Sequence, residues 1–372
     1  MSDRPRICIL TSQYFGWGIY GGFGSMSRKL AENLARVGYT VSVIVPRRQD
    51  QQPIEHINGV EVLSFSPLDI SEAIRLMRTS NAEIFHSQDP TFLTFLAQQV
   101  QPKRIHLVTC RDPRDFKDWF VEFWYATPRR RLLTPFNYLT ESSYFVKRAV
   151  RRAHGVYCPA HFLKSKIQRM YSLREAPTLL PNLIDVPESL PRKSDTPTIT
   201  FIARWDKRKR PWIFLELAEK FPDYRFIAVG QGSASAETGF DRELRQRYSA
   251  VKNLELPGFI NRFKEPERIH QILSDTWVFV STAAREGLPL TFLEAAAYGC
   301  SILSVVNPDE FATRFGVQVR DDDFAAALRA CLANNPLEKG RAAHDYVRGT
   351  YETTKALEAH EEQYARHLNH AR

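Results

Sequence analysis

Two glutamates with seven residues between them give a spacing that can support binding chemistry. Glu286 follows an apolar run at residues 277–280 that is typical of a buried strand, and Glu294 lies within an alanine-rich segment that a proline can open as a helix. The backbone amides of Leu290 and Thr291, at the start of that helix, can bind phosphate, and a carboxylate one turn further in can accept hydrogen bonds from sugar hydroxyls. The alternative is a solvated surface helix, against which the apolar residues around Glu294 argue.

A basic loop follows the strand predicted at residues 198–203. Arg204 stands at the end of this strand, and Lys209 comes five residues later. A guanidinium can bind two phosphate oxygens at once, while an ammonium supplies a compact charge, so the two side chains together can neutralise a diphosphate. Since further cations lie beside them, a merely solvated basic loop explains the pattern equally well, and the chemistry alone leaves both interpretations open.

The segment at residues 16–24 contains the pattern GxGxxG, which is typical of dinucleotide sites. Four residues separate it from the preceding strand, the next helix is predicted from residue 25, and no acidic residue ends the second strand. We interpret the segment as a flexible loop whose backbone amides lie in front of the helix and can bind an anion. An NADP site and a mobile loop without a ligand remain as alternatives.

Short apolar runs alternate with segments of helical periodicity along the chain, which predicts parallel sheets with helices on both faces. The alternation stops at residues 181–197, where four prolines indicate a linker, and then restarts. We therefore predict an α/β protein with two Rossmann-like, doubly wound domains facing a cleft, at residues 1–182 and 183–350. A helical segment at residues 351–372 can pack back on the first domain. The predicted strands are residues 6–11, 40–45, 60–65, 84–86, 105–109, 156–158, 198–203, 224–229, 277–280 and 301–305, and the main predicted helices are residues 25–37, 211–221 and 289–298.

The composition is that of a globular protein. The chain has 372 residues, of which 43% are hydrophobic and 25% are charged, and this excludes a disordered, collagen-like or coiled-coil chain. No apolar run approaches the ~20 residues that span a bilayer, and the first residues lead directly into a strand, which leaves no room for a signal peptide. The five cysteines show no C-x-x-C spacing. We therefore expect reduced thiols and a cytoplasmic protein.

The net charge of +9 is concentrated in one stretch. Residues 129–152 hold seven basic residues against one glutamate, a net +6, and six aromatic residues precede them between positions 116 and 125. Aromatic and basic side chains together fit an anionic membrane surface, such as the inner face of the plasma membrane. They equally fit an anionic or pyrophosphate-linked lipid acceptor, and a solvated basic helix is a third interpretation. A nucleic-acid-binding protein is a fourth, but no recognised motif supports it.

Five segments in this order resemble glycosyltransferase family 4, the retaining enzymes of GT-B fold. The segment EGLPLTFLEAAAYGCSIL (286–303) resembles the family's E-x7-E signature, and FIARWDKRKRP (201–211) resembles its arginine–lysine diphosphate motif. FIAVGQG (226–232) resembles the second glycine turn, LELPGFI (254–260) the turn beside the nucleotide base, and GGFG (21–24) the N-terminal glycine loop. The resemblance covers essentially the whole chain.

This resemblance implies a retaining hexosyltransferase. It would move a sugar from a nucleotide diphosphate sugar to a hydroxyl of a glycan, a lipid-linked acceptor or a small molecule. Family members with these motifs use different donors, and we expect UDP rather than GDP here. The residues that it implies are Arg204 and Lys209 for the donor diphosphate, Glu286 for the transferred sugar, Glu294 for the ribose hydroxyls, Gly287, Leu290 and Thr291 for phosphate or sugar, Gly22, Gly24 and Gly230 for the donor, and Ile260 beside the base.

The sequence departs from the family pattern on the acceptor side. Where the family usually has a histidine after the strand at residues 105–109, this chain has Arg111, followed by Asp112. Arginine can bind phosphate or carboxylate, but it stays protonated and so cannot be an ordinary base. We expect Arg111 to contribute to catalysis and to lie with Asp112 and His86 on the acceptor side, although a histidine at a strand end is more often structural. Pro289 also replaces a glycine that many members have.

We expect no obligatory metal ion and no other cofactor. No D-x-D pair precedes a suitable metal loop in the second half of the chain. Arg204, Lys209 and the helix N-terminus could stabilise the leaving diphosphate without one. A nucleotide-sugar epimerase of similar fold is the alternative among enzymes; it would yield free sugar or an isomerised donor without an acceptor. A basic nucleic-acid-binding protein would leave the paired glutamates unexplained.

Overall fold

The computed structural model describes residues 4–232 and 237–371, and the chain divides into two compact units. Unit 1 comprises Met1–Phe123, Thr127–Leu183 and Thr354–Arg372, and unit 2 comprises Trp124–Ala126 and Ile184–Thr353. Apart from residues 124–126, the chain stays in unit 1 up to Leu183. It then forms unit 2 and returns to unit 1 at Thr354.

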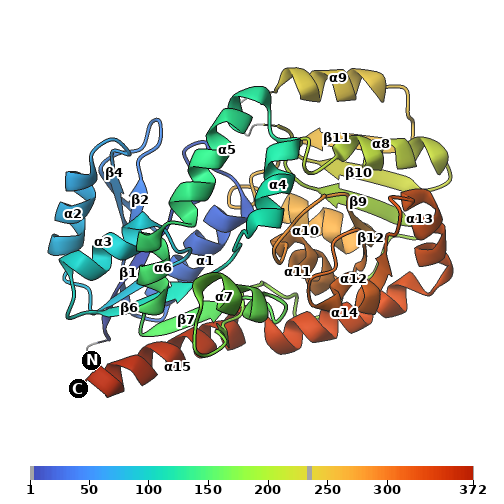
Figure 1. Ribbon diagram of the computed structural model, residues 1–372. Coiled ribbons are helices and arrows are strands. Elements are labelled where there is room, and N and C mark those ends of the chain that lie inside the picture. Colours follow the sequence, from blue (N-terminus) through green and yellow to red (C-terminus); the bar gives the residue numbers. More distant parts are fainter. Residues whose placement is uncertain (1–3, 233–236, 372) are drawn as a thin grey trace. The chain divides into compact units, whose positions relative to one another are not determined.

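Unit 1 is built on a mainly parallel sheet with the strand order β3-β4-β2-β1-β5-β6-β7-β8, in which β3 runs antiparallel to β4 (Figure 1). From β1 the chain builds outward to one side through β2 and β4, and then to the other side from β5 onward. The switch point of this sheet therefore lies between β1 and β5, where ligands bind at the carboxyl ends of the strands in such folds. The strands are β1 (Arg6–Leu10), β2 (Thr40–Pro46), β3 (Ile54–Ile57), β4 (Val60–Phe65), β5 (Ile84–Ser87), β6 (Ile105–Thr109), β7 (Gly155–Cys158) and β8 (Thr178–Leu179).

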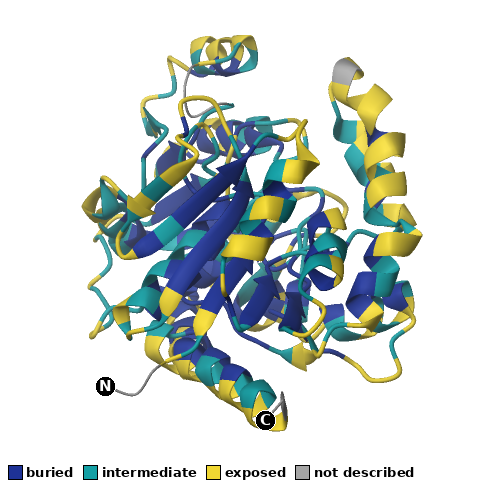
Figure 2. Ribbon diagram, turned by 90° about the vertical axis from the view of Figure 1, so that its left-hand side faces the viewer, coloured by how far each residue is buried: buried dark blue, intermediate teal, exposed yellow. Residues whose placement is uncertain are grey.

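The central strands of unit 1 are apolar throughout because helices cover both faces of a parallel sheet. Figure 2 shows these strands almost wholly in the colour of buried residues. Cys8 and Leu10 of β1 pack with Ile44 of β2, Phe85 of β5 and Met77 of the neighbouring helix. The helices are α1 (Gly22–Arg36), α2 (Ile70–Thr79), α3 (Phe92–Val100), α4 (Phe116–Tyr125), α5 (Pro128–Glu141), α6 (Tyr144–Arg151), α7 (Leu163–Tyr171) and α15 (Thr353–Ala371).

Helix α15 packs on unit 1, and its contacts reach the sheet. The hydroxyl of Tyr364, whose side chain is fully buried, lies 2.8 Å from Nδ1 of His86 in β5. Nε2 of His367 lies 2.8 Å from the hydroxyl of Tyr157 in β7. An ion pair between Arg4 and Glu361, 2.5 Å long, adds a surface contact.

Unit 2 has a parallel sheet with the strand order β11-β10-β9-β12-β13-β14. In chain order this is the 3-2-1-4-5-6 arrangement of a doubly wound nucleotide-binding fold, with the switch point between β9 and β12. The strands are β9 (Thr198–Ile202), β10 (Arg225–Val229), β11 (Leu254–Gly258), β12 (Thr276–Ser281), β13 (Ser301–Ser304) and β14 (Gly316–Gln318).

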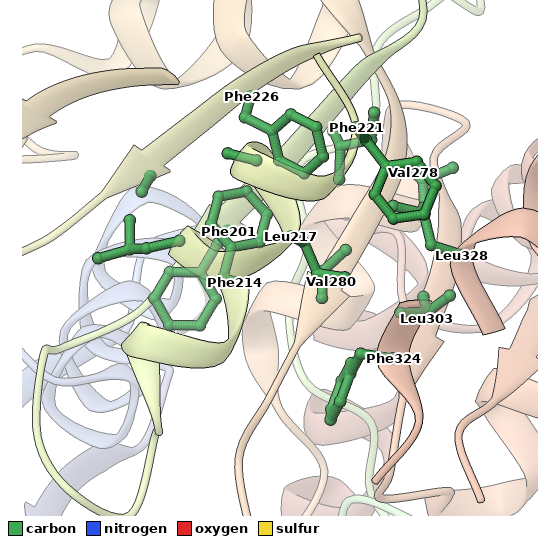
Figure 3. Packing of buried hydrophobic residues seen from close by; sticks show 14 of the residues in the cluster. Phe201, Phe214, Leu217, Phe221, Phe226, Val278, Val280, Leu303, Phe324 and Leu328 are labelled. Carbon is green, nitrogen blue, oxygen red and sulfur yellow. The ribbon is translucent and has the colours of Figure 1, made fainter. Parts of the chain in front are cut away.

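The core of unit 2 lies between this sheet and its helices (Figure 3). Phe201 of β9 stacks on Phe214, which in turn meets Phe226 of β10 edge-on. Val280 of β12 and Leu328 belong to the same buried cluster. The helices are α8 (Pro211–Lys220), α9 (Gly239–Arg247), α10 (Pro266–Asp275), α11 (Leu290–Ala297), the 3₁₀ helix η1 (Pro308–Glu310), α12 (Phe311–Phe315), α13 (Phe324–Ala333) and α14 (Pro336–Thr350).

The structure confirms two Rossmann-like, doubly wound α/β units, and it corrects the start of the first helix. Each predicted strand is present with its ends shifted by no more than one residue. Helix α1, however, begins at Gly22 and not at residue 25, with Gly21 as its N-cap in extended conformation. Glycine is a poor helix former, and this obscured the start in the sequence. The edge strands β3, β8 and β14 were not predicted, because they are only four, two and three residues long and their residues are exposed or partly buried, with no apolar run.

Two further observations concern the cysteines and the length and apolar content of the helices. The five cysteines are free thiols, and all of them are buried. Within the described residues, we find no helix that combines the length and the apolar content needed to cross a bilayer.

Candidate functional site

The predicted donor residues of unit 2 gather at one edge of its sheet. Because the strands of this sheet are parallel, the loops that follow them start from the same edge. Arg204 follows β9, Gly230 follows β10, Ile260 follows β11 and Glu286 follows β12. Strands β9 and β12 are direct neighbours at the switch point, which brings the loops that carry Arg204 and Glu286 side by side.

Hydrogen bonds tie these two loops together. Nε of Arg210 donates to the carbonyl oxygen of Thr282 at 2.6 Å, and the hydroxyl of Thr282 donates to the carbonyl oxygen of Arg210 at 3.0 Å. The amide of Ala284 donates to the carbonyl oxygen of Arg208 at 3.0 Å. The loops are thus held in register, and in this register Nζ of Lys209 forms an ion pair with Oε1 of Glu286.

Asp206, which the sequence analysis missed, orients Arg204. Nε and Nη2 of Arg204 both donate to Oδ2 of Asp206, at 2.9 and 2.7 Å, while Oδ1 accepts from the amide of Lys209 at 3.0 Å. Burial raises the pKa of Asp206, but the charges of Arg204 and Arg208 outweigh it, and the net pKa is lowered. The carboxylate therefore stays ionised, orients the guanidinium of Arg204 and holds the backbone at Lys209. Its position two residues after Arg204 was the signal available in the sequence.

Glu294 also has a cationic partner, which the sequence analysis did not identify. Helix α11 begins at Leu290, one residue later than predicted, with Pro289 as its N-cap. Glu294 lies in the second turn of this helix, and its Oε1 pairs with Nη1 of Arg262, on the loop that follows β11. Both side chains are about one quarter exposed, at 26% and 23%. A ligand can therefore reach a carboxylate that an arginine already orients.

Glycine is required where β10 meets β9. Gly230 has a φ of +132°, a conformation that residues with a side chain rarely adopt, and a Cβ there would overlap the carbonyl oxygen of Ala203. Its amide donates to the carbonyl oxygen of Gly258 at 2.8 Å. Gly230 thus lets the loops after β9, β10 and β11 approach each other. Ile260, expected beside the base, is buried at 5% exposure, so its side chain offers little surface to a ligand.

In unit 1, the glycine segment after β1 is a hydrogen-bonded turn followed directly by α1. Gly16 and Ile19 exchange two backbone hydrogen bonds of 2.9 Å, and Gly16 and Gly18 have positive φ values. Gly22 is the first residue of α1, so the amides of the first turn include those of Gly22 and Gly24. A Cβ on Gly24 would lie 3.1 Å from the backbone nitrogen of Phe15, which explains the small residue there.

His86 is bonded through both ring nitrogens within unit 1. Nδ1 lies 2.8 Å from the hydroxyl of Tyr364, and Nε2 lies 2.8 Å from Oγ1 of Thr109. Burial, followed by the nearby charges of His360 and Arg111, holds the pKa of His86 well below its usual value, so the ring is neutral. In this arrangement neither nitrogen is left for an acceptor, and we assign His86 to attaching α15 to the sheet.

Arg111 is buried at the carboxyl end of β6. Its Nε donates to Oε1 of Gln88 at 3.0 Å, and Nη1 donates to Oδ1 of Asn182. Burial lowers the pKa of Arg111 to about 10, which still leaves the guanidinium charged at neutral pH. Two neutral amides thus bond to the guanidinium, and the charge of nearby Asp89 opposes the effect of burial by raising the pKa of Arg111. Asp112, the next residue, is partly buried.

Asp89 is a further titratable residue on this side, and the sequence analysis overlooked it. It follows β5, three residues after His86. Burial, together with the charges of Asp112 and Glu141, raises the pKa of Asp89 to about 7. A carboxyl group that exchanges its proton near neutral pH, at the carboxyl end of a central strand, is a candidate ligand for a hydroxyl-bearing acceptor.

Two family descriptions match adjoining parts of the chain. The family described as "Glycosyltransferase Family 4" matches residues 20–188, and the family described as "Glycosyl transferases group 1" matches residues 185–343. Among curated proteins, one of the chains of human phosphatidylinositol N-acetylglucosaminyltransferase is 28% identical over 137 residues. This match spans 35% of the present chain and 27% of the human protein.

Solved structures of similar fold cover nearly the whole chain. Sucrose-phosphate synthase from Thermosynechococcus elongatus has a TM-score of 0.72 at 17% identity, over 99% of this chain and 100% of that one. HepE from Anabaena, in complex with UDP and glucose, has a TM-score of 0.67 at 13% identity, over 97% and 99% of the two chains. These matches, with the fold of the two units and the two family matches, lead to one conclusion: the chain is a glycosyltransferase of the family 4 type with the GT-B fold.

Proposed function

We propose that the protein transfers a hexose-type sugar from a nucleotide diphosphate sugar to an acceptor hydroxyl, with retention of the anomeric configuration. One observation carries this proposal. At the switch point of unit 2, the cations Arg204 and Lys209, the carboxylates Glu286 and Glu294, and the start of α11 share one edge of the sheet. Cations and helix amides suit a diphosphate, and carboxylates suit hydroxyl groups, so the set matches the two halves of such a donor.

The proposed reaction breaks one bond and forms another at the anomeric carbon. The bond between this carbon and the diphosphate oxygen breaks, and its electron pair leaves with the diphosphate. The acceptor oxygen bonds to the same face of the sugar, and its proton passes to the leaving phosphate oxygen. Arg204 and Lys209 stabilise the charge that develops on the diphosphate, as preorganised cations do in such transition states, and Glu286 contacts the transferred sugar.

The nucleotide is proposed to be UDP. In this proposal Glu294, oriented by Arg262, accepts hydrogen bonds from the ribose hydroxyls, and the loop after β11 that carries Ile260 lies beside the base. The structure of HepE with UDP and glucose, which has a similar fold, supports this choice of donor. Gly287, Leu290 and Thr291 would offer backbone amides to phosphate or sugar.

The acceptor is proposed to bind on the unit 1 side, where Arg111, Asp112 and Asp89 follow β6 and β5. Glycans, lipid-linked sugars and small molecules all present a suitable hydroxyl. The relative with 28% identity belongs by name to a phosphatidylinositol N-acetylglucosaminyltransferase, and this favours a lipid-linked acceptor among the three. Gly22 and Gly24, at the start of α1, would complete the donor contacts.

A thermal-shift panel of UDP-, GDP- and ADP-sugars tests the donor first, since a ligand that binds the folded state raises the melting temperature. The sugar that stabilises the protein is then incubated with candidate acceptors, and the anomeric configuration of the product is read by NMR. Release of free sugar or an isomerised donor without an acceptor would favour the epimerase alternative. The proposal is refuted if the protein is folded and no nucleotide sugar raises its melting temperature.

A further inference from the structure

A hydrogen-bonded route leads from helix α15 to Arg111, the arginine of the proposed acceptor side. It starts at His360, whose Nε2 lies 3.3 Å from the carbonyl oxygen of Pro181. Since a carbonyl oxygen can only accept, Nε2 carries the proton. Asn182 follows Pro181 in the chain, and its Oδ1 accepts from Nη1 of Arg111. His360 thus bonds to the peptide group that carries one partner of Arg111.

A second route runs from α15 through the sheet of unit 1. The hydroxyl of Tyr364 lies 2.8 Å from Nδ1 of His86 in β5, and Nε2 of His86 lies 2.8 Å from Oγ1 of Thr109 in β6. Two residues further along the chain from each of these, Oε1 of Gln88 accepts from Nε of Arg111 at 3.0 Å. Side chains therefore bridge these two neighbouring segments twice, and α15 holds the first bridge.

The first route is buried along its whole length. Arg111 is 8% exposed, Asn182 3% and His360 1%. A buried guanidinium whose partners shift cannot simply bond to bulk water, so losing a partner costs more than it would at the surface. The peptide bond between Pro181 and Asn182 is planar, so a hydrogen bond to its carbonyl oxygen also restrains the backbone of Asn182. The orientation of Arg111 therefore depends on how firmly this segment is held.

Packing alone does not explain a histidine at position 360. Burial, followed by the charge of Arg111, lowers the pKa of His360 to about 3, so the ring is neutral at physiological pH. Because Nε2 carries the proton, Nδ1 presents a lone pair. Among the residues that the structure describes, this atom is buried without a hydrogen-bond partner, which disfavours the folded state. An apolar side chain of similar volume would avoid that cost but could not bond to Pro181.

We propose that His360 is a positioning residue for the transfer reaction: by holding the peptide group between Pro181 and Asn182, it keeps Asn182 in place and so orients the guanidinium of Arg111. This inference rests on the proposed function, because the orientation of Arg111 affects transfer only if the acceptor binds there. It goes further in giving a residue of the last helix of the chain a part in the reaction.

Two variants of His360 with opposite expectations test this role. His360→Leu removes the donor, whereas His360→Gln places an amide nitrogen where it can still donate to the carbonyl oxygen of Pro181. We expect kcat/KM for the acceptor to fall about tenfold in His360→Leu and to stay within about threefold of wild type in His360→Gln. The thermal shift that the donor causes should persist in both, since most of the proposed donor residues lie in unit 2.

The matched control is His367→Leu. It removes another hydrogen bond between α15 and the sheet, the one to the hydroxyl of Tyr157. If weaker attachment of α15 were enough to impair the reaction, this variant would lose activity as His360→Leu does. We expect its kcat/KM to stay within about threefold of wild type.

A double-mutant cycle separates action through Arg111 from a general loosening of unit 1. If His360 acts through Arg111, His360→Leu should change kcat/KM by less than about twofold when Arg111→Met is already present. NMR follows Arg111 without any reaction. The Nε–H of Arg111, which bonds to Gln88, should exchange with water at least about tenfold faster in His360→Leu than in wild type or His360→Gln. The absence of this signal in Arg111→Lys assigns it.

The outcomes for the inference and for the proposed function are distinct. Unchanged transfer in His360→Leu, losses that add in the double variant, or unchanged exchange of the Arg111 Nε–H would each overturn the inference and leave the proposed function standing. If Arg111→Met does not fold, the exchange measurement decides. If the wild type transfers no sugar, the proposed function fails, and the exchange measurement still decides whether His360 holds Arg111.

Discussion

Nζ of Lys209 pairs with Oε1 of Glu286 across the two tied loops that follow β9 and β12. Their side chains are 20% and 15% exposed, so each charge compensates the burial of the other in the absence of ligand. In the proposed reaction, the diphosphate pairs with the ammonium of Lys209, and the sugar hydroxyls donate hydrogen bonds to the carboxylate of Glu286. The donor then replaces one ion pair with two sets of contacts, which keeps both charges partnered throughout.

Lys209→Ala should lower kcat/KM for sugar transfer by about 10²–10³, because it removes a cation placed for the leaving diphosphate. Steady-state kinetics with the donor found in the thermal-shift panel measure the loss. Lys207→Ala, which removes an exposed lysine from the same loop, should stay within about threefold of wild type. Equal activity of the two variants would mean that Lys209 does not act on the diphosphate.

Arg262→Ala should weaken the binding of UDP by about tenfold, since Glu294 loses the partner that orients it. The decisive comparison uses UDP that lacks both ribose hydroxyls. If Arg262 acts through Glu294 on the ribose, calorimetry should find that wild type and variant bind this analogue with equal affinity. Arg268→Ala, which removes an exposed arginine paired with Glu265, is the control. The same tenfold loss for both ligands would show that Arg262 acts elsewhere.

Gly230→Ala should destabilise the protein by on the order of 2–4 kcal/mol, because the new Cβ would overlap the carbonyl oxygen of Ala203 at a positive φ. Thermal and urea unfolding measure the change in the free energy of unfolding. Gly239→Ala is the matched control, since a Cβ there meets no atom within 4 Å. Comparable losses in the two variants would contradict a requirement for glycine at position 230 specifically.

Asp89 should make stability depend on pH. Its pKa is about 7 in the folded state against 3.8 ordinarily, so between these values the folded state binds more protons than the unfolded state. The contribution of Asp89 to the free energy of unfolding of the protein therefore falls as pH rises from about 4 to about 7. The slope is up to about 1.4 kcal/mol per pH unit.

Asp89→Asn removes this titration. The free energy of unfolding of the variant minus that of the wild type should therefore be larger at pH 8 than at pH 5. Melting curves at the two pH values measure the difference, on the order of 2 kcal/mol. Asp195→Asn, at a carboxylate whose side chain is 91% exposed, reports the effect of the substitution itself. A pH-independent difference at Asp89 would show that its carboxyl group does not titrate near neutrality in the folded protein.

Metal removal should leave the proposed reaction intact, because Arg204, Lys209 and the amides of α11 are proposed to neutralise the diphosphate. Transfer rates after dialysis against EDTA, measured with and without added Mg²⁺ or Mn²⁺, test this expectation. Loss of activity with EDTA and recovery with one of these ions would overturn it.

The sequence predicts which of the candidate residues share one edge of the unit 2 sheet, because their positions follow from local patterns. Arg204 and Glu286 come directly after apolar strands, and parallel strands bring the loops that follow them to one edge. Partners are harder to predict, since they depend on three-dimensional packing. Arg262 lies 32 residues before Glu294, and His86 lies 278 residues before Tyr364. No periodicity encodes such pairs.

Helix α5 shows a second limit of prediction from sequence. Helical spacing places Leu132, Phe136 and Leu139 on one face, but it does not tell which face turns inward. The usual expectation, an apolar face toward the core, is wrong here because Tyr138 and Glu141 find specific partners on the inner side. The cationic and aromatic composition of residues 116–152 indicated an unusual surface, while its orientation required the structure.

Because α15 belongs to unit 1, the order in which the chain is synthesised differs from the order in which its units can be completed. Residues of unit 1 up to Leu183 emerge from the ribosome before nearly all of unit 2, yet the helix that bonds to His86 and Tyr157 emerges only after it. The unit that begins to form first is thus finished last. During synthesis the sheet of unit 1 remains without the contacts of this helix, and chains that stop before Thr353 would lose the integrity of the first unit while the second is nearly complete.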